Sequence, residues 1–260
     1  MIKENIIFLG TTKFSEKILE SLIKDNCNIK AIFSIPEHFS ISYSDVKVKN
    51  INFVDLKPYS NQLGIPYFEI NSEEGHKLIN FEKEIKEICP NVIIAAGWYY
   101  MIPKKIRQIP RHGVWCLHAS LLPNYAGGAP LVWAMINGEK ETGVTLFKAD
   151  GGVDDGDIIF QKKIKIKEKY KIKDLVKKSS KVAKKILLKA VNQNEIIYKP
   201  QDKSKIKIFP QRSPIDGEID WSLDSKTIIN FVKAQSKPYP GAWTIINGKK
   251  ITLWDISIQD

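Results

Sequence analysis

Short apolar runs that alternate with an amphipathic segment constrain the fold of this chain most strongly. A buried strand is predicted over 4–9, a turn over 10–12, and a helix over 14–24 whose apolar residues recur at helical spacing. A second strand is predicted over 29–33. This order opens a Rossmann-like α/β unit with a mostly parallel sheet. Because no Gly-x-Gly-x-x-Gly motif stands at the turn, a dinucleotide ligand is not implied.

The rest of the chain continues this alternation and then changes character. Further strands are predicted over 92–95, 114–117, 143–147 and 158–166, and helices over 129–136 and 172–191. The composition turns polar near residue 200, so we predict a larger α/β domain over 1–200 and a small C-terminal β-rich domain over 201–260. Asn247-Gly248, between two strand-like runs of that domain, is a strong hairpin signal.

Composition and cysteine usage indicate a globular chain. With 260 residues and 43% hydrophobic content, it can bury a full core. The longest apolar runs are far too short to span a bilayer, and the first residues lack a signal-peptide layout, so we expect a cytoplasmic protein without membrane contact. Cys27, Cys89 and Cys116 are widely spaced, which indicates neither a disulfide framework nor a metal site.

The net charge of +11 attracts nucleic acids and small anionic substrates alike. Much of the excess lies between Lys162 and Lys207, where lysines alternate with isoleucines or follow a predicted helix. Few aromatic residues stand among these lysines to stack on bases. A solvated face is therefore favoured over a nucleic-acid surface, and no nucleic-acid partner is expected.

His118 and Asp154 are the candidate catalytic pair. His118 ends an apolar strand before a Pro-rich and Gly-rich turn, where a ligand can reach it, and Asp154 lies in an acidic glycine-rich loop. Acyl transfer to an amine needs a group that takes a proton and a donor for the oxyanion. The histidine suits both roles, and the carboxylate would orient its ring and stabilise its cation. On spacing alone, a structural histidine beside a turn aspartate is the favoured alternative.

Several ordered motifs accompany this pair. They are His118-Ala119-Ser120-Leu121-Leu122-Pro123, Gly127-Gly128-Ala129-Pro130, Glu141-Thr142-Gly143-Val144-Thr145 and Asp154-Asp155-Gly156-Asp157. Together they resemble the core of the folate-dependent formyltransferases, which include methionyl-tRNA formyltransferase and the sugar N-formyltransferases. The likeness continues into Arg212-Ser213-Pro214, Asp216-Gly217-Glu218-Ile219-Asp220-Trp221 and Pro238-Tyr239-Pro240-Gly241-Ala242. It covers most of the chain.

The resemblance implies a formyl donor and a place for it. The implied donor is 10-formyltetrahydrofolate, and no metal is implied. By matching positions, the pocket for this carrier is lined by Tyr100, Met101, Ile102, Asp150, Gly151, Gly152, Val153 and Asp154. Without the other motifs, the segment 100–102 would be interpreted as a surface loop that caps the sheet.

One position departs from the family pattern. Family members carry an asparagine two residues before the histidine, and its amide helps to hold the formyl oxygen, whereas this chain has Cys116. A thiol is a weak donor. Three interpretations stay open: an enzyme that relies on protonated His118 and backbone N–H groups, a slow or altered enzyme, and a covalent role for Cys116. The third keeps Cys116 among the candidate catalytic residues.

The acceptor amine is chosen from features outside the motifs. Methionyl-tRNA formyltransferases carry a larger C-terminal domain and a basic, glycine-containing insertion after the second strand. Here the matching stretch, 42–58, is neither strongly basic nor glycine-rich, and the sequence ends at Asp260. We therefore predict an N-formyltransferase that acts on a nucleotide-linked amino sugar. The resemblance also implies a homodimer with the C-terminal domain as its contact. The alternatives are a methionyl-tRNA formyltransferase and a catalytically weak folate-binding relative.

Overall fold

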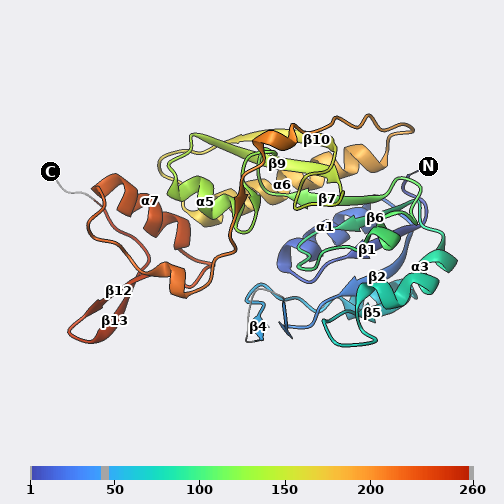
Figure 1. Ribbon diagram of the computed structural model, residues 1–260, viewed down its shortest axis with the longest axis horizontal. Coiled ribbons are helices and arrows are strands. Elements are labelled where there is room, and N and C mark those ends of the chain that lie inside the picture. The colour runs from blue at the N-terminus through green and yellow to red at the C-terminus, as the bar shows by residue number, and fades with distance from the viewer. Residues whose placement is uncertain (1, 42–46, 258–260) are drawn as a thin grey trace.

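The computed structural model describes residues 2–41 and 47–257. Residues 42–46, part of the stretch used above to choose the acceptor, lie outside the described residues. In the described part, a seven-stranded sheet forms the centre of the molecule, in the order β10-β9-β7-β6-β1-β2-β5 (Figure 1). The parallel strands are β1 (Ile6–Leu9), β2 (Ile29–Ser34), β5 (Tyr67–Glu69), β6 (Val92–Ala95) and β7 (Val114–His118). The antiparallel strands are β9 (Glu141–Lys148) and β10 (Ile158–Lys165). The predicted mostly parallel α/β fold is confirmed.

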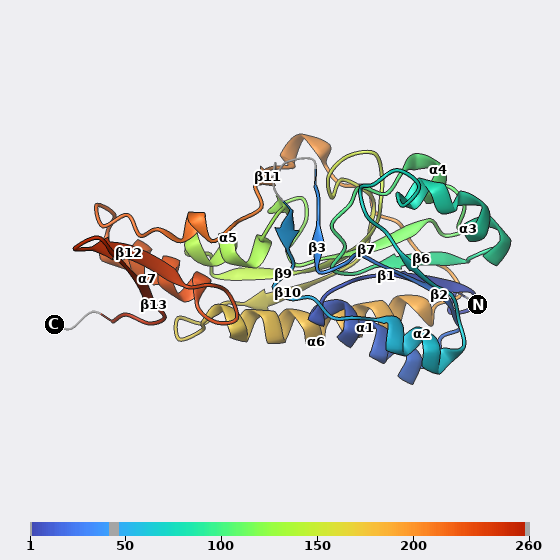
Figure 2. The ribbon, with the colours of Figure 1, turned by 90° about the horizontal axis from the view of Figure 1, so that it is seen from below.

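Helices cover both faces of the sheet (Figure 2). On one face lie α1 (Lys13–Lys24), α2 (Lys57–Leu63) and α6 (Ile172–Val191), and on the other lie α3 (Glu82–Ile88) and α4 (Lys104–Arg107). Successive residues of β1 alternate between the two cores, because side chains of a strand point to opposite faces. Ile6 and Phe8 join the core with α1 and α6, and Ile7 and Leu9 join the core with α3 and α4. Burial on both sides explains why these strands are apolar throughout.

Local sequence explains where the two long helices lie. Thr12 caps α1: its side chain accepts from the Ser15 backbone N–H, and the Ser15 hydroxyl accepts from the Thr12 backbone N–H. Helix α6 buries one apolar side and exposes lysines such as Lys173, Lys177 and Lys181 on the other. Its bounds are the ones that the sequence predicts.

Shorter elements complete the larger domain. They are β3 (His38–Phe39), β4 (Val48–Lys49), the 3-10 helix η1 (Leu78–Phe81), β8 (Ala126–Gly127) and α5 (Pro130–Ile136). Within the described ranges, no helix is long and apolar enough to cross a membrane, and no group of three or more His, Cys, Asp or Glu side chains is arranged to hold a metal ion. The cysteines Cys27, Cys89 and Cys116 are free thiols.

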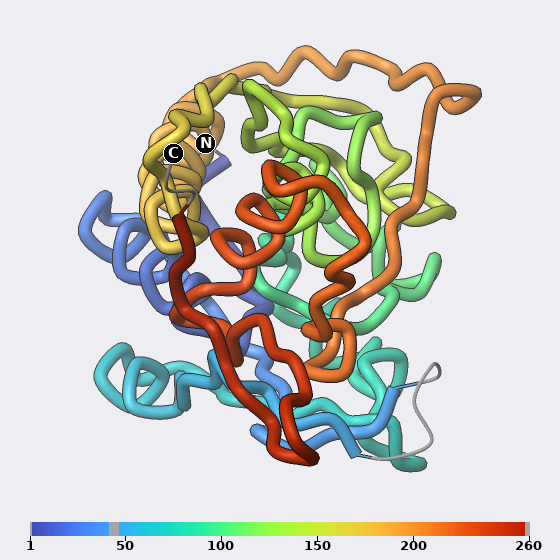
Figure 3. Tube along the Cα trace, turned by 90° about the vertical axis from the view of Figure 1, so that its left-hand side faces the viewer, coloured from blue at the N-terminus to red at the C-terminus, as the bar shows by residue number. Residues whose placement is uncertain are grey.

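The C-terminal unit lies at one end of the molecule (Figures 1 and 2) and faces the viewer in Figure 3. It contains the 3-10 helix η3 (Ile215–Gly217), α7 (Ser225–Gln235) and the antiparallel hairpin of β12 (Ala242–Ile246) and β13 (Lys249–Leu253). Asn247 and Gly248 form the predicted turn, and both have a positive φ as a tight hairpin requires. Antiparallel strands are therefore present as expected, and α7 is an addition that the sequence analysis missed.

Residues 201–211, which we call the strap, connect the two units. The strap contains the 3-10 helix η2 (Lys203–Lys205) and β11 (Ile208–Phe209). Strand β11 pairs in parallel with β8, so the strap lies against the larger domain rather than against the hairpin. The domain boundary at residue 200 stays a prediction.

Candidate active site

His118 and Asp154 lie next to each other. His118 is the last residue of β7, and its Nδ1 is 3.4 Å from Oδ2 of Asp154. Its Nε2 is 2.7 Å from the backbone oxygen of Tyr125. Only 11% of the His118 side chain and 21% of the Asp154 side chain are exposed. Both ring nitrogens therefore face oxygen atoms. A protonated ring satisfies both oxygens as acceptors, whereas a neutral ring has one N–H for the two.

The backbone around this pair adopts an unusual conformation. Tyr125, Ala129 and Asp154 have φ values of 56°, 46° and 51°, in the left-handed region. Such values are uncommon outside glycine and tend to occur at functional sites. Asp154 is held in part by its own carboxylate, because Oδ2 accepts a hydrogen bond from the Gly127 backbone N–H at 2.8 Å. That bond joins the acidic loop to the turn after His118.

Residues of the Glu141–Thr145 motif hold the turn that follows His118. Thr145 lies opposite His118 in the register of β9 and β7, and its hydroxyl donates to the Ser120 carbonyl at 2.7 Å. The same hydroxyl accepts from the Leu122 backbone N–H at 3.2 Å. Gly143 leaves room for the turn, since a Cβ there would lie 2.3 Å from Cδ2 of Leu121. The motif therefore fixes the end of β7.

Cys116 lies on β7, two residues before His118, with its side chain partly buried. Burial raises the pKa of its thiol to about 12, with a further rise from the Asp154 charge and an opposing effect from Arg107. The group is therefore a protonated thiol at neutral pH. A covalent role needs the thiolate, so this environment disfavours that interpretation.

Arg107 is a charged residue near this centre that the sequence analysis missed. It ends α4, its side chain is 15% exposed, and Nη1 is 3.9 Å from Oδ1 of Asp150. Its Nε is buried and has no acceptor among the described residues. Within the same described part of the chain, the buried indole Nε1 of Trp98 also lacks an acceptor. Arg107 lies outside the motifs quoted for the resemblance, so its place in the fold reveals it.

The residues predicted for the carrier pocket lie in two neighbouring segments. Ile102 belongs to one core cluster, and Tyr100 and Ala149 both pack against that cluster. Ala149 directly precedes the acidic loop. Met101 is 62% exposed and Ile102 is buried. The Tyr100 hydroxyl donates to the Ser40 carbonyl at 3.0 Å, and burial raises its pKa to about 12. Of the three, Met101 is therefore the side chain most available to a ligand.

The acidic loop contributes the remaining predicted carrier residues. Asp150, Gly151, Gly152 and Val153 are exposed, while Asp154 is partly buried. Hydrogen bonding to Lys203, at 3.0 Å, keeps the pKa of Asp150 below its usual range. A Cβ at Gly151 would meet no atom within 4 Å, so the space beside it is open.

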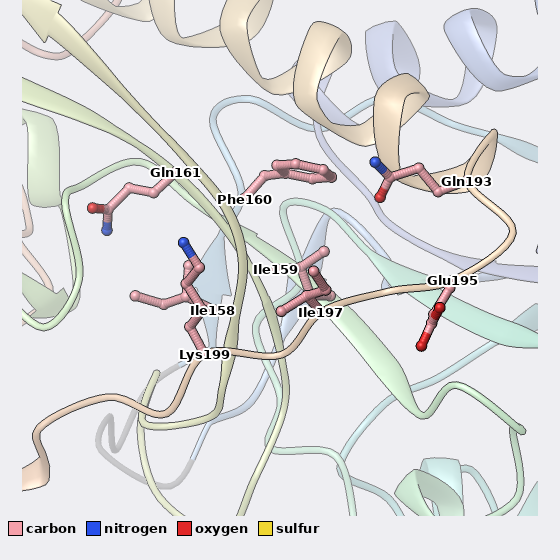
Figure 4. Close-up of a pocket in the computed structure, with 8 residues that line it drawn as sticks. All are labelled: Ile158, Ile159, Phe160, Gln161, Gln193, Glu195, Ile197 and Lys199. Carbon is pink, nitrogen blue, oxygen red and sulfur yellow. The ribbon is translucent and has the colours of Figure 1, made fainter.

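A cavity of about 530 Å³ lies elsewhere, along the edge strand β10 (Figure 4). It is lined by Ile158, Ile159, Phe160, Gln161, Gln193, Glu195, Ile197 and Lys199. Its mixed lining contains neither His118 nor Asp154. The candidate active site at the end of β7 therefore lies outside this cavity.

Comparison with known families agrees with this geometry. The formyl transferase family profile matches residues 4–191, and the profile of the formyl transferase C-terminal domain matches residues 212–260. The chain belongs to the formyltransferase family, and it is an enzyme of that class. Members of the family use formyl-tetrahydrofolate.

Individual relatives are similar over nearly the whole chain. The methionyl-tRNA formyltransferase of Thermodesulfovibrio yellowstonii is 33% identical over 255 residues, which cover 97% of this chain and 80% of that protein. The structure of methionyl-tRNA formyltransferase from Clostridium thermocellum superposes with a TM-score of 0.67 at 18% identity, and covers 98% of this chain and 93% of its own. The N-formyltransferase of Helicobacter canadensis, in complex with folinic acid and dTDP-3-aminofucose, has a TM-score of 0.70 at 20% identity, with 96% and 86% covered.

These relatives correct the predicted acceptor. Eight curated relatives at 29–33% identity are methionyl-tRNA formyltransferases, whereas the likeness to sugar enzymes is a structural one at low identity. The prediction of a nucleotide-linked amino sugar is therefore wrong. It rested on chain length and on the composition of the stretch 42–58, and surface loops are the parts that vary most between relatives.

Proposed function

We propose that this enzyme transfers a formyl group from 10-formyltetrahydrofolate to the amino group of methionyl-tRNA. The observation that carries the proposal is similarity to methionyl-tRNA formyltransferases over 97% of this chain and 80% of the relative. The net charge of +11 suits a polyanionic acceptor. The expectation that no nucleic acid binds rested on the lysines between Lys162 and Lys207, which have few aromatic residues among them, and this proposal replaces it.

The residues around the predicted carrier pocket fit a folate. A pterin ring offers acceptor atoms, and the buried Nε1 of Trp98 and Nε of Arg107 are donors without an acceptor in the described structure. Met101 and the open space beside Gly151 leave room for a ring. We therefore assign the carrier to the two predicted segments, 100–102 and 150–154. When bound, the carrier supplies an activated formyl group.

His118 is proposed to take the proton that the attacking amine loses. Its Nε2–H donates to the Tyr125 carbonyl, which selects the tautomer whose lone pair is on Nδ1. A proton gained at Nδ1 then lies beside the Asp154 carboxylate, 3.4 Å away, which stabilises the cation. The ring afterwards returns the proton to the leaving group. Asp154 orients the ring and balances its charge throughout.

Donors for the developing oxyanion are fewer than in the family pattern. The thiol of Cys116 is protonated and is a weak donor. The His118 cation and backbone N–H groups are left to stabilise the negative charge, as in the first of the three interpretations above. We therefore propose a competent enzyme in which the oxyanion is stabilised less than it would be with the family's asparagine.

The test is formylation of methionyl-tRNA by the purified protein with 10-formyltetrahydrofolate, followed by mass spectrometry of the released aminoacyl group. We expect N-formylmethionine, and far less of it from the same reaction with His118→Ala stopped at the same time. A panel of nucleotide-linked amino sugars is the comparison. Formylation of a sugar but not of methionyl-tRNA would overturn the proposal.

Two further features of the protein remain proposals. We propose a homodimer, for which light scattering of the eluted protein would give the mass. We also propose a cytoplasmic location, for which cell fractionation is the measurement.

A further inference from the structure

Gln201, the first residue of the strap, contacts the acidic loop directly. Its Nε2 donates to the backbone oxygens of Asp154, at 2.8 Å, and Gly156, at 2.6 Å. Only 9% of Gln201 is exposed. Because both partners are carbonyl oxygens, the nitrogen of the amide must be the atom that faces them. One side chain outside the loop thus binds the backbone at Asp154 and again two residues later, at Gly156.

Asp154 needs such support because of its backbone. With φ of 51°, it adopts a left-handed conformation that costs free energy for a residue with a Cβ. Gly151, Gly152 and Val153, which precede it, are exposed, so they are not packed in a core that would impose this conformation. The amide of Gln201 is a buried group that fixes the peptide on the far side of Asp154. It therefore helps to determine where the carboxylate points.

The other end of the strap contacts the turn that follows His118. Strand β11 pairs with β8, and the Gly128 backbone N–H donates to the Phe209 carbonyl at 2.8 Å. The Phe209 ring stacks on Tyr125 with 4.6 Å between ring centroids. The backbone oxygen of Tyr125 is the partner of His118 Nε2. A Cβ at Gly128 would lie 2.4 Å from Cα of Gln211, so the strap passes in close contact.

A third attachment lies at the surface. Lys203 pairs with Asp150 at 3.0 Å and with Asp155 at 3.2 Å, and 60% of its side chain is exposed. Exposed ion pairs of this kind contribute little to stability, so the buried amide of Gln201 is the stronger attachment. The strap therefore holds the acidic loop at Gln201 and the turn after His118 at Phe209.

We propose that Gln201 is a positioning residue for formyl transfer, and that the strap sets the approach of the Asp154 carboxylate to the His118 imidazole. This proposal rests on the roles assigned above to those two residues. Gln201 acts through Asp154 and touches no reacting atom. Its loss should therefore lower the rate of the chemical step and leave substrate binding nearly unchanged.

The first experiment compares Gln201→Met with Lys205→Met. Methionine is close to glutamine in volume and lacks the donor. Lys205 lies in the same strap and pairs with Asp202, away from the acidic loop. For Gln201→Met we expect kcat to fall about 10-fold to 100-fold, the range for groups that orient a catalytic residue, with KM changed less than about threefold. Lys205→Met should keep the wild-type kcat.

A second readout needs no acceptor. In the free protein, the imidazole ¹⁵N chemical shifts of His118, assigned with His118→Ala, report the hydrogen bonds of its two nitrogens. We expect the Nδ1 signal to move in Gln201→Met and to stay in place in Lys205→Met. This measurement separates the proposal from the choice of acceptor, because it holds even if methionyl-tRNA is not formylated.

Two results would contradict the role given to Gln201. Unchanged kcat and unchanged His118 shifts in Gln201→Met would overturn it, and so would equal losses in Lys205→Met. If Gln201→Met unfolds below the assay temperature, Phe209→Leu tests the contact between the strap and Tyr125. That variant keeps an apolar side chain and loses the stacking on Tyr125. It should also lower kcat and move the Nε2 signal, and wild-type values for both would overturn the proposal.

Discussion

The two sides of the candidate site are held very differently. The loop 150–156 is bonded to Gly127, Gln201 and Lys203, all of them far away in sequence. The segment 100–102 has an exposed Met101 at its centre, and the hydroxyl of its Tyr100 donates to the Ser40 carbonyl. The loop proposed to assist proton transfer is thus held by hydrogen bonds from several distant segments. The side proposed to hold the carrier keeps one side chain free to adapt.

This difference follows from what each side must do. Proton transfer depends on atoms held within fractions of an ångström, and hydrogen bonds from distant elements provide that precision. A flat ring is bound by shape and by a few donors, for which a flexible methionine is well suited. Substitutions on the loop side should therefore change kcat, and substitutions on the other side should change KM for the carrier.

The largest effect is expected for His118→Ala. Loss of the proposed base and of its cation should lower kcat by about 10²-fold to 10⁴-fold, the usual contribution of a general base. His76→Ala, a change at an exposed histidine, is the matched control. Single-turnover formylation measures the step directly. A His118→Ala protein with full activity would exclude this residue from the chemistry.

Asp154→Asn should have the next largest effect. The amide keeps an oxygen for the Gly127 N–H and loses the charge beside His118 Nδ1, so we expect kcat to fall about 10-fold to 100-fold. Asp255→Asn, an exposed aspartate of the C-terminal unit that pairs with Lys171, is the control and should keep the wild-type activity. Equal rates for the two variants would show that the charge near His118 has no role.

Cys116→Asn tests the missing amide. If one side-chain donor to the oxyanion is worth about 10²-fold in rate, its restoration should raise kcat by up to that factor. KM should stay near the wild-type value, because the bond forms as charge develops. A lower kcat in Cys116→Asn would show instead that the site is built around the thiol.

Much of the fold and the central pair could be predicted from the sequence. The sequence predicts β1, α1 and α6 because each keeps one burial pattern along its length: β1 is buried on both faces, and the helices bury one side. The His118 and Asp154 pair follows from ordered motifs. Arg107 and Gln201 could not be found this way, since each acts through a contact between segments distant in sequence. The helix α7 was missed because strand-like runs beside it dominated the interpretation.

The three cysteines should differ in their rate of alkylation. With its pKa raised to about 12 by burial, Cys116 holds a fraction of only about 10⁻⁴ as thiolate at pH 8, and this fraction grows as the pH rises toward 12. Exposed Cys89 should therefore be alkylated by iodoacetamide at pH 8, while Cys116 and buried Cys27 stay unmodified. Peptide mass mapping measures each site. Rapid labelling of Cys116 would restore the covalent interpretation.

Met101→Ala should have the smallest effect, and it tests the adaptable side of the site. Its side chain is 62% exposed, so truncation leaves the core intact and removes only apolar surface available to a ligand. Loss of such a contact should raise KM for 10-formyltetrahydrofolate about 3-fold to 10-fold and leave kcat within about twofold, because binding is weakened equally in the ground and transition states. Ile251→Ala, an exposed apolar change on the distant hairpin, is the control and should leave both constants unchanged. A fall in kcat for Met101→Ala with KM unchanged would mean that this side also positions reacting groups, and the contrast between the two sides would not hold.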